Sequence, residues 1–189
     1  VTSKAKKAFE VYADVTIKNG TVKAIERCVD TRTNVNLTLD TVVLEATGTS
    51  GEVQPLTIGG SDHGTKVTVV NSTIKAGKAG YAIISFVKSE ILVKNSSVYG
   101  YAALYLKAGS DESVVNFNGS VIETKGYDNE IFGTFVIEDI SGATVTTDEA
   151  TTINAGTYVV YFSTYQNAVS TNNTANIAGT INATKAVKG

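Results

Sequence analysis

The sequence is poor in several residue types, and each shortage excludes something. It has no methionine or tryptophan, and only one cysteine, one proline and one histidine. Cys28 is the single cysteine, so no disulfide can form within the chain. Arginine occurs only as Arg27 and Arg32, so bidentate phosphate recognition is not expected as a main activity. No stretch of about 18 residues is continuously apolar, so no membrane span is expected.

Charge and length narrow the class of protein further. The formal net charge is −2, so there is no basic surface of the kind that binds nucleic acid, and we expect no nucleic-acid partner. The 189 residues are enough for one domain with a continuous core. Because the sequence starts at Val1 without a signal-like segment, we expect a mature or excised piece whose targeting segments are not shown.

The sequence contains an internal repeat. Five ten-residue segments align without gaps: VTIKNGTVKA (15–24), LTLDTVVLEA (37–46), VTVVNSTIKA (67–76), ILVKNSSVYG (91–100) and VNFNGSVIET (115–124). Their starts lie 22, 30, 24 and 24 residues apart. Two poorer copies follow at 143–155 and 175–183. Repeats of this period are typical of solenoids, and the copies predict about seven coils.

The columns of the repeat predict its local structure. The first and third positions are apolar in all five good copies, as in a strand with one buried face. The eighth position is also apolar, although a step of five would turn it to the opposite face of a straight strand. A bend at the fifth position brings all three inward. That position holds Asn19, Thr41, Asn71, Asn95 and Gly119. Asparagine and glycine tolerate the left-handed backbone region, so each copy is expected to form strand, one-residue corner and strand.

These features predict an all-β fold, a single-stranded parallel β-helix over residues 13–189. An antiparallel sandwich also has short strands, but it does not explain why the same pattern returns after a whole coil. Stacked coils do, because like positions then form ladders. Residues 1–12 lie outside the repeat, and we expect an N-terminal cap over the first coil or a linker.

The pattern V-x-I-x-N-[GS]-T-[VI] resembles right-handed parallel β-helix proteins of the pectin-lyase-like superfamily. Within that group the chain is most similar to repetitive adhesin-like surface proteins. The resemblance covers about residues 13–185 and implies right-handed coils and an extracellular or cell-surface location. It says little about activity, because this fold hosts lyases, glycosidases, adhesins and phage tailspikes.

Four tyrosines are the candidate ligand-binding residues: Tyr81, Tyr101, Tyr127 and Tyr158. Each follows a repeat, so on one face they would form a row of rings, and rings with hydroxyls suit sugar faces. The alternative is an aromatic stack that closes the core. Its further members would be Phe86, Tyr105, Phe132, Phe135, Tyr161 and Phe162.

A catalytic set is harder to find. Asp62 and His63 lie in the insertion after the second repeat, but hydrolysis needs two carboxylates and no partner can be assigned. Arg32 is the candidate base of a lyase. Cys28 is expected to be a small core residue. The paired acids are expected in solvated loops and show no calcium-binding register: Asp111-Glu112, Asp128 with Glu130, Glu138-Asp139 and Asp148-Glu149.

Two further patterns follow from the repeat. Seven N-x-[ST] sequons occur, and we interpret them mainly as a by-product of the corner asparagines: Asn19, Asn36, Asn71, Asn95, Asn118, Asn172 and Asn182. The ninth repeat position alternates in charge and predicts a solvated outer ladder with weak pairing: Lys23, Glu45, Lys75, Tyr99 and Glu123.

Three functions remain open. The leading hypothesis is a non-enzymatic surface module, adhesin-like or a stalk, whose partner is a polysaccharide or host-surface glycan. The second is a small polysaccharide lyase or glycoside hydrolase. The third is a subunit that self-associates end to end into fibres. No metal or other cofactor is expected.

Overall fold

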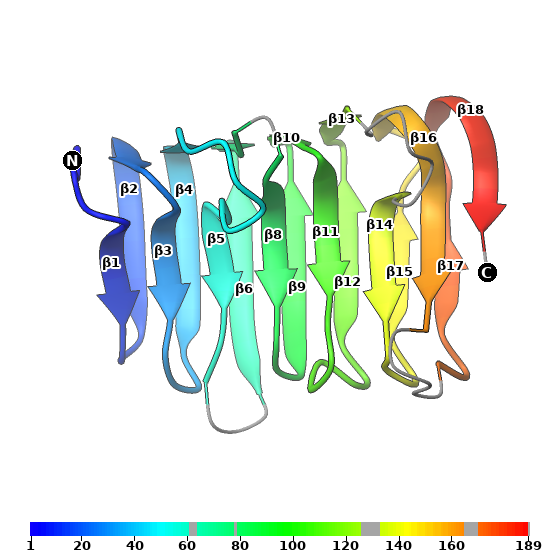
Figure 1. The fold of residues 1–189 in the computed structure, drawn as a ribbon, viewed down its shortest axis with the longest axis horizontal. Helices are drawn as coiled ribbons and strands as arrows, with labels where there is room; N and C mark the ends of the chain where they lie inside the picture. The colour runs from blue at the N-terminus through cyan, green and yellow to red at the C-terminus, as the bar shows by residue number, and fades with distance from the viewer. Residues whose placement is uncertain (61–63, 78, 126–132, 165–169, 189) are drawn as a thin grey trace.

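The fold consists entirely of β-strands in the part of the chain that is described. The computed structural model describes residues 1–60, 64–77, 79–125, 133–164 and 170–188, and every regular element there is a strand. Every strand pair in these ranges is parallel. The strands succeed one another along an elongated body with the two termini at opposite ends (Figure 1). The prediction of an all-β, parallel, solenoid-like chain is confirmed.

The strands form three ladders. The first contains the first half of β2 (Val15–Ala24), the first half of β4 (Asn36–Ala46), β6 (Thr65–Val70), β9 (Ser89–Lys94), β12 (Val114–Asn118), β15 (Thr144–Thr147) and β17 (Thr174–Asn176). The second contains the second halves of β2 and β4, β7 (Thr73–Lys75), β10 (Ser97–Gly100), β13 (Val121–Thr124), and the first halves of β16 (Thr152–Ser163) and β18 (Thr180–Lys188).

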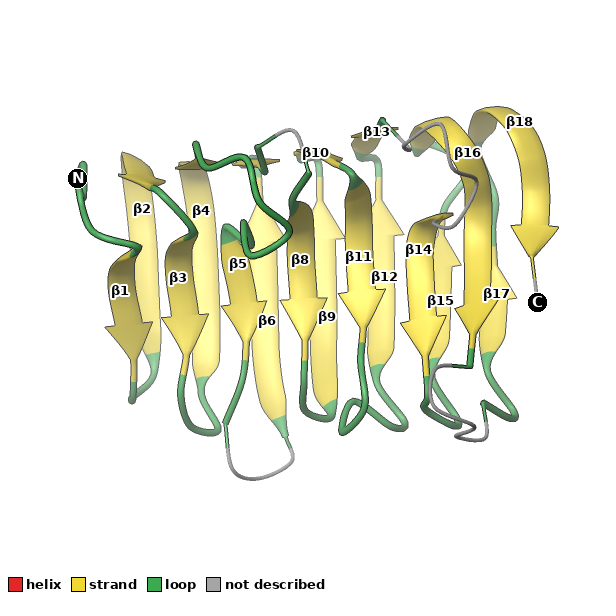
Figure 2. Cartoon of the chain, in the orientation of Figure 1, coloured by secondary structure: helices red, strands yellow, loops and turns green. Residues whose placement is uncertain are grey.

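The third ladder consists of β1 (Lys7–Val11), which precedes the first repeat, and of the strands that follow each repeat along the chain. These are β3 (Arg27–Thr31), β5 (Leu56–Ile58), β8 (Tyr81–Ser85), β11 (Ala102–Leu106), β14 (Gly133–Glu138), and the second halves of β16 and β18. In Figure 2 the third ladder faces the viewer, the first lies behind it, and the second runs along the top. The ten-residue repeat thus supplies two of the three ladders.

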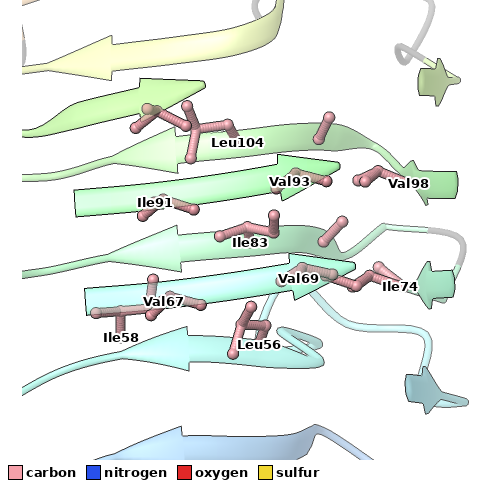
Figure 3. Close-up of a cluster of buried hydrophobic side chains, with 14 of the residues drawn as sticks. Leu56, Ile58, Val67, Val69, Ile74, Ile83, Ile91, Val93, Val98 and Leu104 are labelled. Carbon is pink, nitrogen blue, oxygen red and sulfur yellow. The ribbon is translucent and has the colours of Figure 1, made fainter. Parts of the chain in front are cut away.

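The register of the first two ladders reproduces the columns of the repeat. Leu37 pairs with Val15 on one side and Val67 on the other, and Leu44 pairs with Val22 and Ile74. The poorer copies follow the same columns, since Val145 pairs with both Val115 and Ala175. These side chains face one continuous core between the layers, and part of it is seen in Figure 3.

The left-handed corner is confirmed at the fifth repeat position. The backbone angle φ is 52° at Asn19, 57° at Thr41, 50° at Asn71, 49° at Asn95 and 56° at Gly119. Such values suit asparagine and glycine and are costly for most other residues. Backbone conformation therefore explains the asparagines at the fifth position, Asn19, Asn71 and Asn95.

Substitution of a corner asparagine tests this explanation. We expect Asn71→Ala to lower the free energy of unfolding by about 1 kcal/mol, because alanine pays the left-handed penalty without a compensating side chain. Asn71→Gly should be close to neutral in denaturant titrations. If Asn71→Ala were as stable as Asn71→Gly, the left-handed conformation would not be the reason for asparagine there.

A column of buried hydroxyls accompanies the corner. The hydroxyl of Ser96 accepts the backbone N–H of Ser72 at 3.1 Å, and that of Ser120 accepts the N–H of Ser96 at 3.3 Å. Thr151 continues the column by accepting the N–H of Ser120 at 3.4 Å. The side chains therefore join successive coils where the chain turns, and they satisfy backbone donors that would otherwise be buried without a partner.

Residues 1–12, expected to be a cap or linker, follow the course of the next coil. β1 pairs in register with β3, and Thr2 forms a parallel bridge with Lys23. The backbone N–H of Ser3 donates to the carbonyl of Lys23 at 2.8 Å. These residues thus lie along the outer edges of β3 and of the second half of β2. No helix that could cross a membrane is found in the described residues.

Candidate functional site

The outer face of the third ladder carries a group of tyrosines. Tyr81 begins β8, Tyr101 directly precedes β11, and Tyr105 lies within β11. Tyr158 and Tyr161 lie in the second half of β16. β8, β11 and β14 are buried along nearly their whole length. The outward positions of these strands therefore hold apolar or aromatic side chains, as the inward positions do.

The outward residues form a small cluster separate from the main core. Tyr105 is in register with Ile84 on one side and Val136 on the other, and Val136 pairs with Tyr161. Ile84, Tyr105 and Val136 are each less than 5% exposed, whereas Tyr161 is half-buried. The third ladder therefore packs side chains on both of its faces.

The structure brings two of the four predicted tyrosines together. The Tyr81 and Tyr101 rings have centroids 6.1 Å apart, and Tyr81 meets the edge of Tyr105 at 4.9 Å with an interplanar angle of 75°. Such geometry is favourable for aromatic pairs. Tyr158 lies further along the ladder, where it is in register with Gly133 and its ring lies 5.2 Å from the Lys185 Nζ. Tyr127 lies outside the described residues.

We call Tyr81, Tyr101, Tyr105, Lys107 and Glu138 the tyrosine cluster. Glu138 ends β14 and is only 8% exposed, and its Oε1 lies 3.6 Å from the Lys107 Nζ. The same ammonium lies 5.1 Å from the centre of the Tyr105 ring. Burial raises the pKa of Tyr105, and its hydrogen bond with Glu138 raises it further. Burial also raises the pKa of Tyr81, so both phenols remain O–H donors at neutral pH.

The expectation that Glu138 is a solvated loop acid is wrong. Glu138 occupies a strand position, where its carboxylate accepts a hydrogen bond from Tyr105 and lies within ion-pair distance of the Lys107 ammonium. Two core-stack expectations also need correction. Tyr105 is buried in the outer cluster, and Phe86 is 38% exposed. Phe135 does lie in the main core, where its ring centroid is 5.2 Å from that of Phe117.

The candidate lyase base Arg32 takes part in an ion-pair cluster near the N-terminal end. The buried Asp30 Oδ2 lies 2.8 Å from the Lys7 Nζ, 3.1 Å from the Arg27 Nη1 and 3.5 Å from the Arg32 Nη1. The nearby Asp30 carboxylate raises the pKa of Arg32, which holds the guanidinium in its charged form. Asp30, the common partner of both arginines, is not one of the paired acids considered from the sequence.

Within the part of the chain that the structure describes, the other catalytic candidates are not brought together into a site. Asp62 and His63 lie outside the described residues. Among the residues that are described, no group of three or more His, Cys, Asp or Glu side chains could hold a metal ion. Asp148 accepts the backbone N–H of Gly119 at 2.9 Å and the Thr151 hydroxyl at 2.7 Å, which lowers its pKa and gives it a structural role at a corner.

Cys28 is a core residue, as predicted. It is fully buried, and burial raises the pKa of its thiol to about 12. We expect the native protein at pH 8 to react with a thiol reagent at least about 100-fold more slowly than the unfolded protein, because the thiolate is the reactive form. A Cys28→Ala, Ser50→Cys variant, with its thiol at an exposed loop position, should react at once. Equal rates for the two native proteins would contradict the buried position.

The alternating charges at the ninth repeat position form the predicted outer ladder. Lys23, Glu45 and Lys75 are in register, and Glu45 lies within ion-pair distance of both lysines. The Lys23 ammonium lowers the pKa of Glu45. All three side chains are partly exposed, so each pair contributes little to stability.

Comparison of the chain with protein-family models, with curated proteins and with solved structures finds no match.

Proposed function

We propose that this chain is a non-enzymatic, adhesin-like module that acts outside the cell or at its surface and binds glycans at the tyrosine cluster. In this proposal the ladders form a right-handed parallel β-helix of about seven coils, related to the pectin-lyase-like superfamily. The observation that carries the proposal is the gathering of Tyr81, Tyr101 and Tyr105 on one outer face.

The chemistry of the cluster supports a sugar ligand. Tyr81 and Tyr101 are half-buried, so part of each ring remains accessible. An aromatic ring packs against the C–H face of a pyranose, and a phenol hydroxyl adds a hydrogen bond. Lys107 is a donor and Glu138 an acceptor beside the rings, which matches the mixed hydrogen-bonding of sugar hydroxyls. The packed residues beneath hold the rings in place, which reduces the entropy lost on binding.

The first test is a glycan array followed by titration of the best ligand. We expect the full chain to bind, and Tyr81→Ala and Tyr101→Ala each to weaken binding about tenfold, the loss of about 1.4 kcal/mol from one ring contact. Tyr12→Ala is the matched control, because Tyr12 is 62% exposed and lies between β1 and β2, away from the cluster.

The outcomes separate the parts of the proposal. Binding that is lost in the cluster variants and kept in Tyr12→Ala supports the assignment. Binding that survives both cluster substitutions would move the site elsewhere on the surface. No binding to any glycan would refute the adhesive role, whereas a role as a structural stalk does not depend on this experiment.

A further inference from the structure

Four successive coils place one residue each in a row across the outer face of the third ladder. Arg32 directly follows β3, Gly59 follows β5, Phe86 follows β8 and Lys107 follows β11. The backbone N–H groups of Gly59, Phe86 and Lys107 each donate to the carbonyl of the last residue in the preceding strand of the ladder, at 3.2, 2.9 and 3.0 Å. The four positions therefore lie side by side, and we call them the Arg32 row.

The Arg32 row runs into the tyrosine cluster. Phe86 is 38% exposed, although the outward Tyr105 of the next strand is only 4% exposed. Lys107 belongs to the cluster, and its ammonium lies over the Tyr105 ring. Gly59 has no side chain, so the row is low between Arg32 and Phe86. A ligand bound beside Phe86 can therefore extend over the glycine to Arg32.

Positive charge is in excess at the Arg32 end of the row. Three cations share the Asp30 carboxylate, and Glu10, which lies 2.7 Å from one of them, is the second carboxylate of this group. Glu26 and Glu52 both act on a lysine beyond the opposite end of β3. Arg32 has the longest contact with Asp30, 3.5 Å, and its side chain is 43% exposed. Its guanidinium can therefore bind an incoming anion while the other two cations keep Asp30 paired.

The Phe86 end of the row has no such excess. The Lys107 ammonium lies 3.6 Å from the Glu138 carboxylate, so its charge is balanced within the protein. Because an aromatic ring packs against the C–H face of a pyranose, this end suits an uncharged sugar, whereas the Arg32 end suits an acidic group. Arg32 and Phe86 are two coils apart, about 10 Å, which is close to the length of two linked pyranose rings.

We propose that the glycan bound at the tyrosine cluster is acidic and contains a hexuronic acid whose carboxylate binds Arg32. The planar guanidinium of arginine matches a carboxylate through two parallel hydrogen bonds. An uncharged sugar two residues along the glycan then packs against Phe86, beside the tyrosine rings. This inference rests on the proposed function, because it names the class of glycan that the same site takes.

Titration with paired oligosaccharides tests the acidic class. Hyaluronan oligosaccharides alternate glucuronic acid with an uncharged N-acetylated sugar, and their carboxyl-reduced forms lack only the charge. We expect the full chain to bind the acidic form about fivefold more tightly than the reduced form, the effect of one exposed ion pair, and the difference should shrink at high salt. Arg32→Gln should abolish the difference, whereas Phe86→Ala should weaken the binding of both forms alike.

A matched control removes the same charge elsewhere. Lys18 is also an exposed cation beside a carboxylate, 3.3 Å from Asp40, but it lies in the first ladder. Lys18→Gln should therefore keep the preference for the acidic form. Arg32→Lys retains the charge without the planar fork and should keep only part of the preference. Circular dichroism spectra establish that each variant is folded before its affinity is compared.

The outcomes separate this inference from the proposed function. Equal binding of the acidic and reduced forms, weakened by Tyr81→Ala, would leave the tyrosine site in place but overturn its acidic class. A preference that survives Arg32→Gln would overturn the role of Arg32. A preference lost equally in Lys18→Gln would indicate attraction by net charge alone, which also overturns it. Absence of binding to every glycan would refute the proposed function, and this inference with it.

Discussion

Replacing Phe117 with alanine is expected to lower the free energy of unfolding by about 3–5 kcal/mol, the usual range for loss of a buried aromatic side chain. Phe117 is fully buried in the third repeat position, and its ring lies 5.2 Å from that of Phe135 across the core. Its neighbour in the next coil is Thr147, a smaller side chain that cannot fill the space. The substitution should therefore leave a large cavity between the first and third ladders, both of which pack against this ring.

Urea titration followed by circular dichroism measures this loss. Because coils contact mainly their neighbours, unfolding of a solenoid can depart from two states, so coincidence of the circular dichroism and tyrosine fluorescence transitions should be checked first. Phe86→Ala is the control, since Phe86 is 38% exposed and should change stability by less than about 1 kcal/mol. Equal losses in the two variants would show that Phe117 is not the better-packed ring.

The repeat predicted two ladders because both of their signals are local. An apolar residue at the first, third and eighth positions, with asparagine or glycine at the fifth, specifies two strands and the corner between them. The third ladder has no such pattern. β8 and β11, YAIIS and AALYL, are buried on both faces, so they show no alternation between apolar and polar residues. The insertions between repeats also differ in length, which hides the column.

The candidate site could be predicted only in part, because its contacts depend on the register between strands and not on a local pattern. Tyr81 and Tyr101 stand out because each follows a glycine after a repeat. The hydrogen bond between Tyr105 and Glu138 depends on the register between β11 and β14, which are separated along the chain by β12 and β13. Glu138 is followed by Asp139, a pair that is typical of an exposed loop. Only the register shows that the first acid is buried and the second occupies a left-handed corner.

The outer face of the third ladder changes from charged to apolar and aromatic side chains along the axis. One outward column begins with Glu10 and Asp30, continues with Thr57, and becomes Ile84, Tyr105 and Val136. The segment before β5 lies between the ionic and aromatic parts, since the carbonyl of Val53 accepts the N–H of Tyr81 and the N–H of Gln54 donates to the backbone carbonyl of Glu26. A single repeated backbone thus carries two chemically different surfaces on one face.

The ionic part is expected to show the second large effect. Asp30 is 1% exposed, and its Oδ2 is the common partner of Lys7, Arg27 and Arg32. Hydrogen bonding to Asp30 is also the main reason that the pKa of Lys7 is raised. Removing this carboxylate leaves three cations close together without their shared anion. Breaking a buried ion pair from one side costs several kcal/mol, because the remaining charges stay partly desolvated.

We expect Asp30→Ala to lower the free energy of unfolding by about 3 kcal/mol, at the low end for buried pairs because the three cations are partly exposed. Asp30→Asn keeps the shape but also removes the charge, so it should lose a comparable amount. Glu10→Gln is the matched control: Glu10 also contacts Lys7, but its side chain is 40% exposed, and the change should stay below about 1 kcal/mol. Urea titrations of the three variants decide the matter, and an Asp30→Asn protein as stable as the parent would show that packing, rather than charge, holds this end of the third ladder together.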